Sequence, residues 1–193
     1  MCYFLRIFSQ TADSFLPSQL AEAVDCSVSI TAMFESEWRE LTFRISDDAE
    51  IILVERSSVT ESEDCRDELS EIISELEKDL TPSKTWVIDY LKKTCVLYTI
   101  EVSSLQGLRT AARIQTEIWL KVNGLLQSDL EGFRDELGYL IVATGNNMQG
   151  VQRVAVLQDE RWVRFSIDMA NEVQVGSFFA GKVPVGTGIH AVG

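Results

Sequence analysis

The sequence predicts an α+β protein, built mainly from antiparallel β-sheet with helices packed on one face. Two observations indicate this class. Short apolar or alternating segments, typical of strands, recur along the 193 residues and often follow one another without a helix between them. Amphipathic segments with apolar residues three and four positions apart, typical of helices, separate these groups of strands. The 46% of hydrophobic residues can supply a core for one large domain or two small ones.

The first sixty residues are expected to form four strands and one short helix. The strands are expected over residues 2–9, 27–34, 40–45 and 51–55, and the helix over 17–24. Strand 51–55 begins with four consecutive apolar residues, from Ile51 to Val54. Such a run is typical of a strand covered on both faces, so we expect it near the centre of the sheet.

Residues 60–80 form the best-defined helix of the sequence. Thr60 and Glu63 have the spacing of a capping box, and Pro82 cannot continue a helix, so both ends are specified. The apolar side chains recur at helical spacing and must be buried together: they are Cys65, Leu69, Ile72, Ile73, Leu76 and Leu80.

Negative charge is concentrated on this helix. Between Glu61 and Asp79 there are nine carboxylates but only two bases, so the segment carries a charge of minus seven. Residues 1–80 hold nineteen acids and six bases, whereas residues 81–193 hold eleven of each, so the first part accounts for the whole net charge of minus thirteen. The excess either solubilises an outer face or forms a surface that binds a basic partner. The second interpretation assigns partner binding to Asp64, Asp67, Glu68, Glu71 and Glu75.

The second part is expected to begin with a helix, a strand and another helix, and to continue as β-structure. Thr81 and Pro82 open a helix that ends at Lys93, and a serine at 103 or 104 opens the next, which ends near Val122. Periodicity predicts the buried side chains of this later helix as Leu105, Leu108, Ala112, Ile118 and Trp119. Strands are expected over residues 95–102, 125–128, 132–134, 139–143, 151–157 and 162–167.

The order of elements allows an acidic half at residues 1–80 and a neutral half at residues 81–193 with similar topology, or one continuous domain. At this level the order resembles the paired strand-helix-strand-strand modules of gyrase-inhibitor-like effector-binding domains. The resemblance implies a small-molecule pocket between the halves. It rests on element order and implies no particular site residues.

Known nucleotide-binding and catalytic patterns are not satisfied. Residues 176–182 match a phosphate loop except at Val183, where Ser or Thr is required, and the glycines and proline that follow oppose the helix such a loop must open. We therefore expect an ordered loop anchored by Phe178 and Phe179. The single histidine, His190, lies three positions from the end, so no histidine-based metal site, no Ser-His or Cys-His pair and no cofactor is expected.

Two further places are candidates for binding. Asp129 and Glu131 project to the same side if their segment is extended, with Arg134 close behind, so these three form the candidate ligand site. Acids flanking a β-turn are the alternative. Trp162 lies at the shoulder of a hairpin, so we expect it to be exposed enough to contact a partner, whereas the other tryptophans are expected in the core.

Three functions are consistent with these features. The preferred one is an inhibitor-like or immunity-like protein that binds a basic partner, and the second is a small-molecule-binding domain with a pocket lined by Tyr90, Tyr98 and Trp119. The third is a histidine-independent enzyme that uses Asp129 and Glu131. The acidic charge disfavours nucleic acid, and no apolar run is long enough to span a membrane. Four separated cysteines and the lack of a signal peptide predict a cytoplasmic protein.

Overall fold

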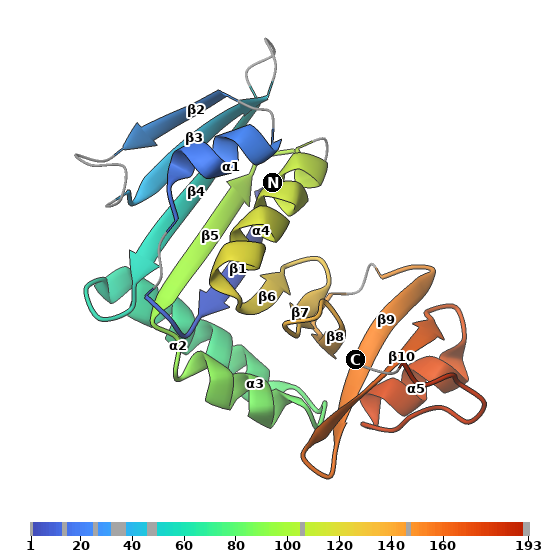
Figure 1. The fold of residues 1–193 in the computed structure, drawn as a ribbon. Helices are drawn as coiled ribbons and strands as arrows, with labels where there is room; N and C mark the ends of the chain where they lie inside the picture. The colour runs from blue at the N-terminus through green and yellow to red at the C-terminus, as the bar shows by residue number, and fades with distance from the viewer. Residues whose placement is uncertain are drawn as a thin grey trace.

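The computed structural model describes residues 2–12, 15–24, 27–31, 38–45, 50–104, 107–145 and 148–190 (Figure 1). The described strands are β1 (Tyr3–Ser9), β2 (Ser27–Thr31), β3 (Glu40–Ile45), β4 (Glu50–Ser58), β5 (Val96–Val102), β6 (Leu125–Ser128), β7 (Gly132–Arg134), β8 (Leu140–Ala143), β9 (Val151–Gln158) and β10 (Arg161–Asp168). The described helices are α1 (Pro17–Val24), α2 (Glu63–Lys78), α3 (Lys84–Leu91), α4 (Leu108–Val122) and α5 (Glu172–Phe179). None of these helices is long and apolar enough to cross a membrane.

A single sheet of ten strands organises these elements, in the order β10-β9-β8-β7-β6-β1-β5-β4-β3-β2. Neighbouring strands are antiparallel except β8 and β9, which are parallel and paired at Leu140 and Val154. β1 lies between β5 and β6, so strands from residues 1–80 and 81–193 are hydrogen-bonded to one another. The expected α+β class with a mainly antiparallel sheet is confirmed. The last three residues of the expected strand 27–34 lie outside the described residues.

The helices are divided between the two faces of the sheet, although the sequence predicts helices on one face. Successive residues of a strand point to opposite faces. Ile7 belongs to the core beneath α1 and α4, whereas Phe8 belongs to the core beneath α2 and α3, and Tyr98 and Leu97 on β5 divide in the same way. Because both sets of side chains are apolar here, each face needs its own helices. Figure 1 shows α1 and α4 in front of the strands and α2 with α3 at one end of β5.

The core beneath α1 and α4 is rich in aromatic residues. The ring centroids of Phe15, Trp38 and Tyr98 lie 5.3 to 6.0 Å apart, and Trp38 Nε1 donates a hydrogen bond of 3.1 Å to the carbonyl oxygen of Phe15. Burying such rings together with a satisfied polar atom stabilises and orders a core. This core holds β1, β3, β4 and β5 in place, and the opposite face of these strands contributes to the candidate site.

α2 begins two residues later than the capping box predicts. Ser62 is the N-cap, and its side chain accepts a hydrogen bond of 3.2 Å from the backbone N–H of Cys65, so the assignment of Thr60 as the N-cap is wrong. Leu80, beyond the end of the helix, is 92% exposed rather than part of the buried stripe. The buried side chains of α2 are Cys65, Leu69 and Leu76.

β4 alternates and is not covered on both faces. Ile52 and Val54 are fully buried beneath α1 and α4, but Ile51 is 46% exposed. β4 is the third strand from the β2 edge of the sheet. The apolar run therefore marks a strand with one covered face, and the expectation of double cover is wrong.

α4 turns a different face inward from the one that periodicity predicts. Its buried side chains are Ala111, Ile114, Ile118 and Val122. Ala112 is exposed, and Leu108 and Trp119 are only partly buried against the core. The sequence prediction counts the helix from Leu105, which lies outside the described residues, and this displaces the predicted face by about one position.

Residues 172–179 form helix α5, which overlaps the ordered loop expected over residues 176–182. The side chain of Asn171 caps the helix by accepting hydrogen bonds from the backbone N–H groups of Val173 and Gln174. The phosphate-loop pattern therefore lies over the end of a helix, and no helix follows in residues 180–190 to bind phosphate. Phe178 is fully buried against β9 and β10, whereas Phe179 is 41% exposed.

Candidate functional site

A polar row crosses the face of the sheet that α2 and α3 cover only at one end. Directly paired residues of neighbouring strands point to the same face. The row consists of the successive register partners Gln127, Arg6, Thr99, Glu55 and Glu40, on β6, β1, β5, β4 and β3. Apolar residues of the same face, such as Phe8 and Leu97, are buried beneath the helices. The row therefore begins where the apolar cover ends.

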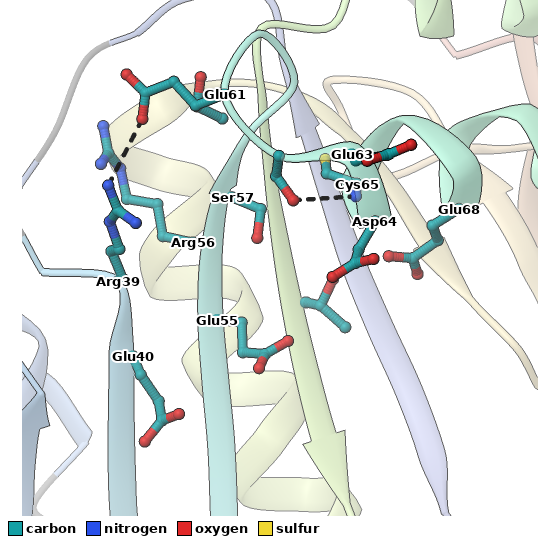
Figure 2. A pocket seen from close by; sticks show the side chains of 13 residues that line it. Arg39, Glu40, Glu55, Arg56, Ser57, Glu61, Glu63, Asp64, Cys65 and Glu68 are labelled. Carbon is teal, nitrogen blue, oxygen red and sulfur yellow. Dashed lines mark hydrogen bonds and ion pairs between the residues drawn. The ribbon is translucent and has the colours of Figure 1, made fainter.

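The first hollow lies between the N-terminal half of α2 and strands β3, β4 and β5, and has a volume of about 540 Å³. Six carboxylates line it: Glu40, Glu55, Glu61, Glu63, Asp64 and Glu68. Figure 2 shows Asp64 and Glu68 on the helix side, with Glu40 and Glu55 on the strands. Its two arginines, Arg39 and Arg56, lie at the Glu61 end, where Arg39 Nη2 is 3.7 Å from a carboxylate oxygen of Glu61.

Carboxylates repel one another in this hollow. Glu55 is paired in register with Glu40, and like charges directly opposite each other destabilise a sheet. Partial burial raises the pKa of Glu55 from its ordinary value, and the charges of Glu40, Glu101 and Glu68 raise this pKa further. The electrostatic potential in the hollow is therefore negative, and a bound cation would make it less negative.

The second hollow lies beside the C-terminal half of α2 and has a volume of about 580 Å³. Apolar side chains form part of its wall: Ile72, Leu76, Phe133 and Ala143. Charged side chains surround them: Arg6, Glu71, Glu75, Lys78, Asp79 and Asp129. Within this set Lys78 Nζ is 2.6 Å from Glu75 Oε1. The hollow combines apolar surface with an excess of carboxylates.

Arg6 lies at the junction of the two hollows. Its Nε donates to Glu68 Oε1 at 2.6 Å, and its Nη1 donates to Asp129 Oδ1 at 2.7 Å and to Gln127 Oε1 at 2.8 Å. Glu68 lines the first hollow, and Arg6, Gln127 and Asp129 line the second. This arginine joins α2, β1 and the end of β6, and it neutralises Glu68 with a base from the same acidic half of the chain.

Five carboxylates of the α2 segment form an acidic flank beside the hollows. Asp64, Glu68, Glu71, Glu75 and Asp79 follow one another at spacings of three or four residues, which places them on one side of the helix. At 1.5 Å per residue the flank is about 22 Å long. Asp67 is midway between the buried residues Cys65 and Leu69, so it points away from the sheet and outside the flank. Four of the five predicted partner-binding carboxylates therefore share one surface.

The structure brings together Glu131 and Arg134 of the predicted ligand site and places Asp129 beside α2. Residues 129–131 form a turn between β6 and β7, not an extended segment, so Asp129 and Glu131 diverge. Asp129 pairs with Arg6 beside α2, whereas Glu131 pairs with Arg134 at 2.9 Å in a third hollow, of about 200 Å³, which α4 lines on the opposite face. The two carboxylates therefore have separate ion-pair partners, Arg6 for Asp129 and Arg134 for Glu131.

The aromatic residues of the small-molecule hypothesis are also separated. Tyr98 is fully buried in the core beneath α1 and α4, and Trp119 lies partly buried at the edge of this core. Tyr90 packs against Trp86 on the opposite face. None of the three lines the first or the second hollow.

Trp162 is partly buried at the edge of the core beneath α2 and α3. Its ring meets that of Trp86 edge to face, with a centroid distance of 5.0 Å. The β9–β10 hairpin therefore packs against α3 through this contact. Trp162 lines neither the first nor the second hollow.

Among the described residues that line the hollows, the one cysteine is Cys65. Cys65 lies in the wall of the first hollow, but burial raises the pKa of its thiol to about 11, so the thiol stays protonated near neutral pH. Within the described ranges, no group of three or more His, Cys, Asp or Glu side chains is placed to hold a metal ion.

Sequence reasoning missed Arg6 and the facing pair of Glu40 and Glu55. The signal for Arg6 is a single charged residue within the apolar strand 2–9, because a charge there requires a partner. No comparable signal marks Glu40 and Glu55, since their proximity depends on the register of β3 and β4. A search of family models, curated proteins and solved structures finds no significant match to this chain.

Proposed function

We propose that the chain is a protein-interaction module that binds a basic segment of a partner along the acidic flank of α2. The observation that carries the proposal is the first hollow, where carboxylates from α2 face the register pair of Glu40 and Glu55 while both arginines lie at one end. A lysine or arginine side chain in this hollow would replace repulsion between carboxylates with attraction.

The dimensions of the flank suit an extended peptide. A flank about 22 Å long matches about seven residues of extended chain, at about 3.3 Å per residue. The apolar wall of the second hollow, formed by Ile72, Leu76 and Phe133, would pack against the aliphatic part of a long basic side chain. The carboxylates of Glu71 and Glu75 would then face its charged end. The proposed ligand is therefore a short segment with several lysines or arginines.

Small-molecule binding is the second candidate, supported by the volume of the second hollow. Its 580 Å³ falls within the range of about 300 to 1,000 Å³ that is typical of ligand sites. Its excess of carboxylates favours a cationic molecule with an apolar body. An organic cation that binds more tightly than any basic peptide would favour this candidate.

The experiment measures the affinity of a fluorescent, lysine- and arginine-rich heptapeptide by anisotropy at low and high salt. Asp64→Asn with Glu71→Gln removes two charges from the flank, and neither carboxylate has an ion-pair partner among the described residues. We expect roughly tenfold weaker binding, because each lost charge contact weakens association. Affinity should also fall steeply as salt rises.

The matched control is Asp67→Asn with Glu77→Gln, which removes the same two charges from parts of α2 that do not line the hollows. We expect a change of less than about twofold from this control, because exposed charges at a distance are screened. If both double variants lose the same affinity for the peptide, the effect comes from the overall charge of the protein and not from the flank. Either that result or an absence of binding at low salt would refute the proposal.

A further inference from the structure

A second polar cluster lies in the neutral part of the chain, on the β9–β10 hairpin. Arg153 on β9 and Ser166 on β10 are directly paired, so their side chains point to the same face, with Cβ atoms about 5 Å apart. The first and second hollows contain no residue of this hairpin. The cluster is therefore separate from the proposed peptide site.

The chain returns to this place after α5. Ile189 bridges to Phe165 at the outer edge of β10, and the backbone N–H of His190 donates to the carbonyl oxygen of Arg164 at 2.7 Å. This short pairing puts the imidazole beside the hairpin. His190 Nε2 lies 3.4 Å from Ser166 Oγ, and His190 Nδ1 lies 3.0 Å from the phenol oxygen of Tyr139. The single histidine is thus held at both ring nitrogens.

Arg153 is positioned but not neutralised. Its guanidinium carbon lies 4.1 Å from the ring centroid of Tyr139, which holds the group over the ring by a cation–π interaction. Among the described residues no carboxylate forms an ion pair with Arg153. The neighbouring Arg164 differs, because its Nη2 lies 2.8 Å from Asp135 Oδ2 and 3.1 Å from Glu136 Oε1. Arg153 therefore supplies the uncompensated positive charge of the cluster.

We propose that Arg153, Ser166 and His190 bind a phosphate-type oxyanion, either free phosphate or the phosphoryl group of a small molecule. A guanidinium binds two oxygens of such a group side by side, and the serine hydroxyl and an imidazole N–H reach further oxygens. In the tautomer in which the phenol of Tyr139 donates to Nδ1 of His190, the ring proton lies on Nε2 beside Ser166. Tyr139 thus positions both Arg153 and His190.

The chemistry of the donors favours phosphate over a simple carboxylate. One arginine alone satisfies the two oxygens of a carboxylate, whereas Ser166 and His190 add donors that suit a tetrahedral group with more oxygens. The net charge of minus thirteen opposes anions at long range, but ionic screening limits that repulsion to about 8 Å at physiological salt. Local contacts with Arg153 therefore decide binding.

The single histidine of the 193-residue chain gives a direct readout of this site. The imidazole C–H signals of His190 are followed by NMR while inorganic phosphate is added at constant ionic strength and pH, with chloride as the non-binding anion. We expect a saturable shift. A parallel titration with phenyl phosphate distinguishes the two sources. Tighter binding of inorganic phosphate indicates free phosphate as the ligand, and tighter binding of phenyl phosphate indicates a phosphorylated small molecule.

Variants separate the site from general charge effects. Arg153→Gln should weaken phosphate binding by at least about tenfold, because it removes a charge-assisted pair of hydrogen bonds. Ser166→Ala, a smaller change, should weaken binding by severalfold. Arg161→Gln is the control, since it removes the same charge from an exposed position on the same hairpin and should leave binding unchanged.

Three results would overturn the proposal. They are a shift that rises linearly without saturation, the same shift with chloride alone, and equal affinities for Arg153→Gln and the wild-type protein. Circular dichroism of each variant shows whether it is folded, and Ser166→Ala still tests the site if Arg153→Gln is not. Unchanged phosphate binding in the flank variants of α2 would show that this site is independent of the proposed peptide site.

Discussion

The two faces of the sheet differ in how completely helices cover them. Beneath α1 and α4, the inward side chains of β1, β3, β4 and β5 belong to one apolar core. On the other face of the same strands, the apolar cover of α2 and α3 stops at the row that runs from Gln127 through Arg6 and Thr99 to Glu55 and Glu40. One face is thus devoted to stability, and the other leaves polar groups accessible beside an acidic helix.

The comparison separates residues that are neighbours in sequence. Ile100 is fully buried under α1 and α4, whereas Thr99, the preceding residue, lines the first hollow. Alternation along one strand therefore places a core residue beside a site residue. Substitutions that keep both the fold and the net charge can test this division directly.

The largest expected effect comes from the covered face. Ile100→Ala should lower the free energy of unfolding by about 2 to 5 kcal/mol, because it leaves a cavity in a filled core. Thr99→Ala on the same strand should change it by less than about 0.5 kcal/mol. Urea denaturation measures both. Similar losses in the two variants would show that the two faces contribute alike, which contradicts the comparison.

An intermediate effect is expected at the boundary between the hollows. Arg6→Met keeps the aliphatic bulk but removes the bonds to Glu68, Asp129 and Gln127, so unfolding should become easier by about 1 to 2 kcal/mol. Glu68→Gln should cost less, and a double-mutant cycle should give a coupling above about 0.5 kcal/mol. Additive effects would mean that the ion pair does not link α2 to β1.

The smallest effect is expected at Glu55 and depends on pH. Because the folded state raises the pKa of this carboxyl, ionised Glu55 destabilises the fold at neutral pH and protonated Glu55 does not. Glu55→Gln should therefore increase the free energy of unfolding at pH 7 by at most about 0.5 kcal/mol. The change is measured as a slightly higher melting temperature. The advantage should shrink as the pH falls through the raised pKa and vanish below the ordinary glutamate value of about 4.5.

The control for this measurement is Glu22→Gln, an exposed position of α1 on the covered side of the sheet. We expect this control to change stability at pH 7 by less than Glu55→Gln does. An advantage of Glu55→Gln that persists unchanged at pH 4 would have to come from something other than the charge of the carboxyl.

Local pattern predicted helix α1 and several strands, but it missed the start of α2 and helix α5. Helix 17–24 and strands 40–45, 125–128 and 132–134 agree with α1, β3, β6 and β7, because apolar spacing and turn residues act over a few positions. The β9–β10 hairpin was predicted as well, and it turns at Asp159 and Glu160, which both have positive φ. The start of α2 was displaced because Ser62 and Thr60 are equally suitable caps in sequence. Helix α5 was missed because glycine and valine in residues 172–179 do not favour a helix.

The sequence by itself determined the α+β class, the amphipathic stripe of α2 and the concentration of acids along it. Only the tertiary structure decided which of these acids share a surface, that Arg6 joins Glu68 to Asp129, and that Asp129 and Glu131 part to opposite faces. The reason is physical. Helical and strand periodicity act between residues a few positions apart, whereas the register of β-strands brings together side chains that are distant in the chain.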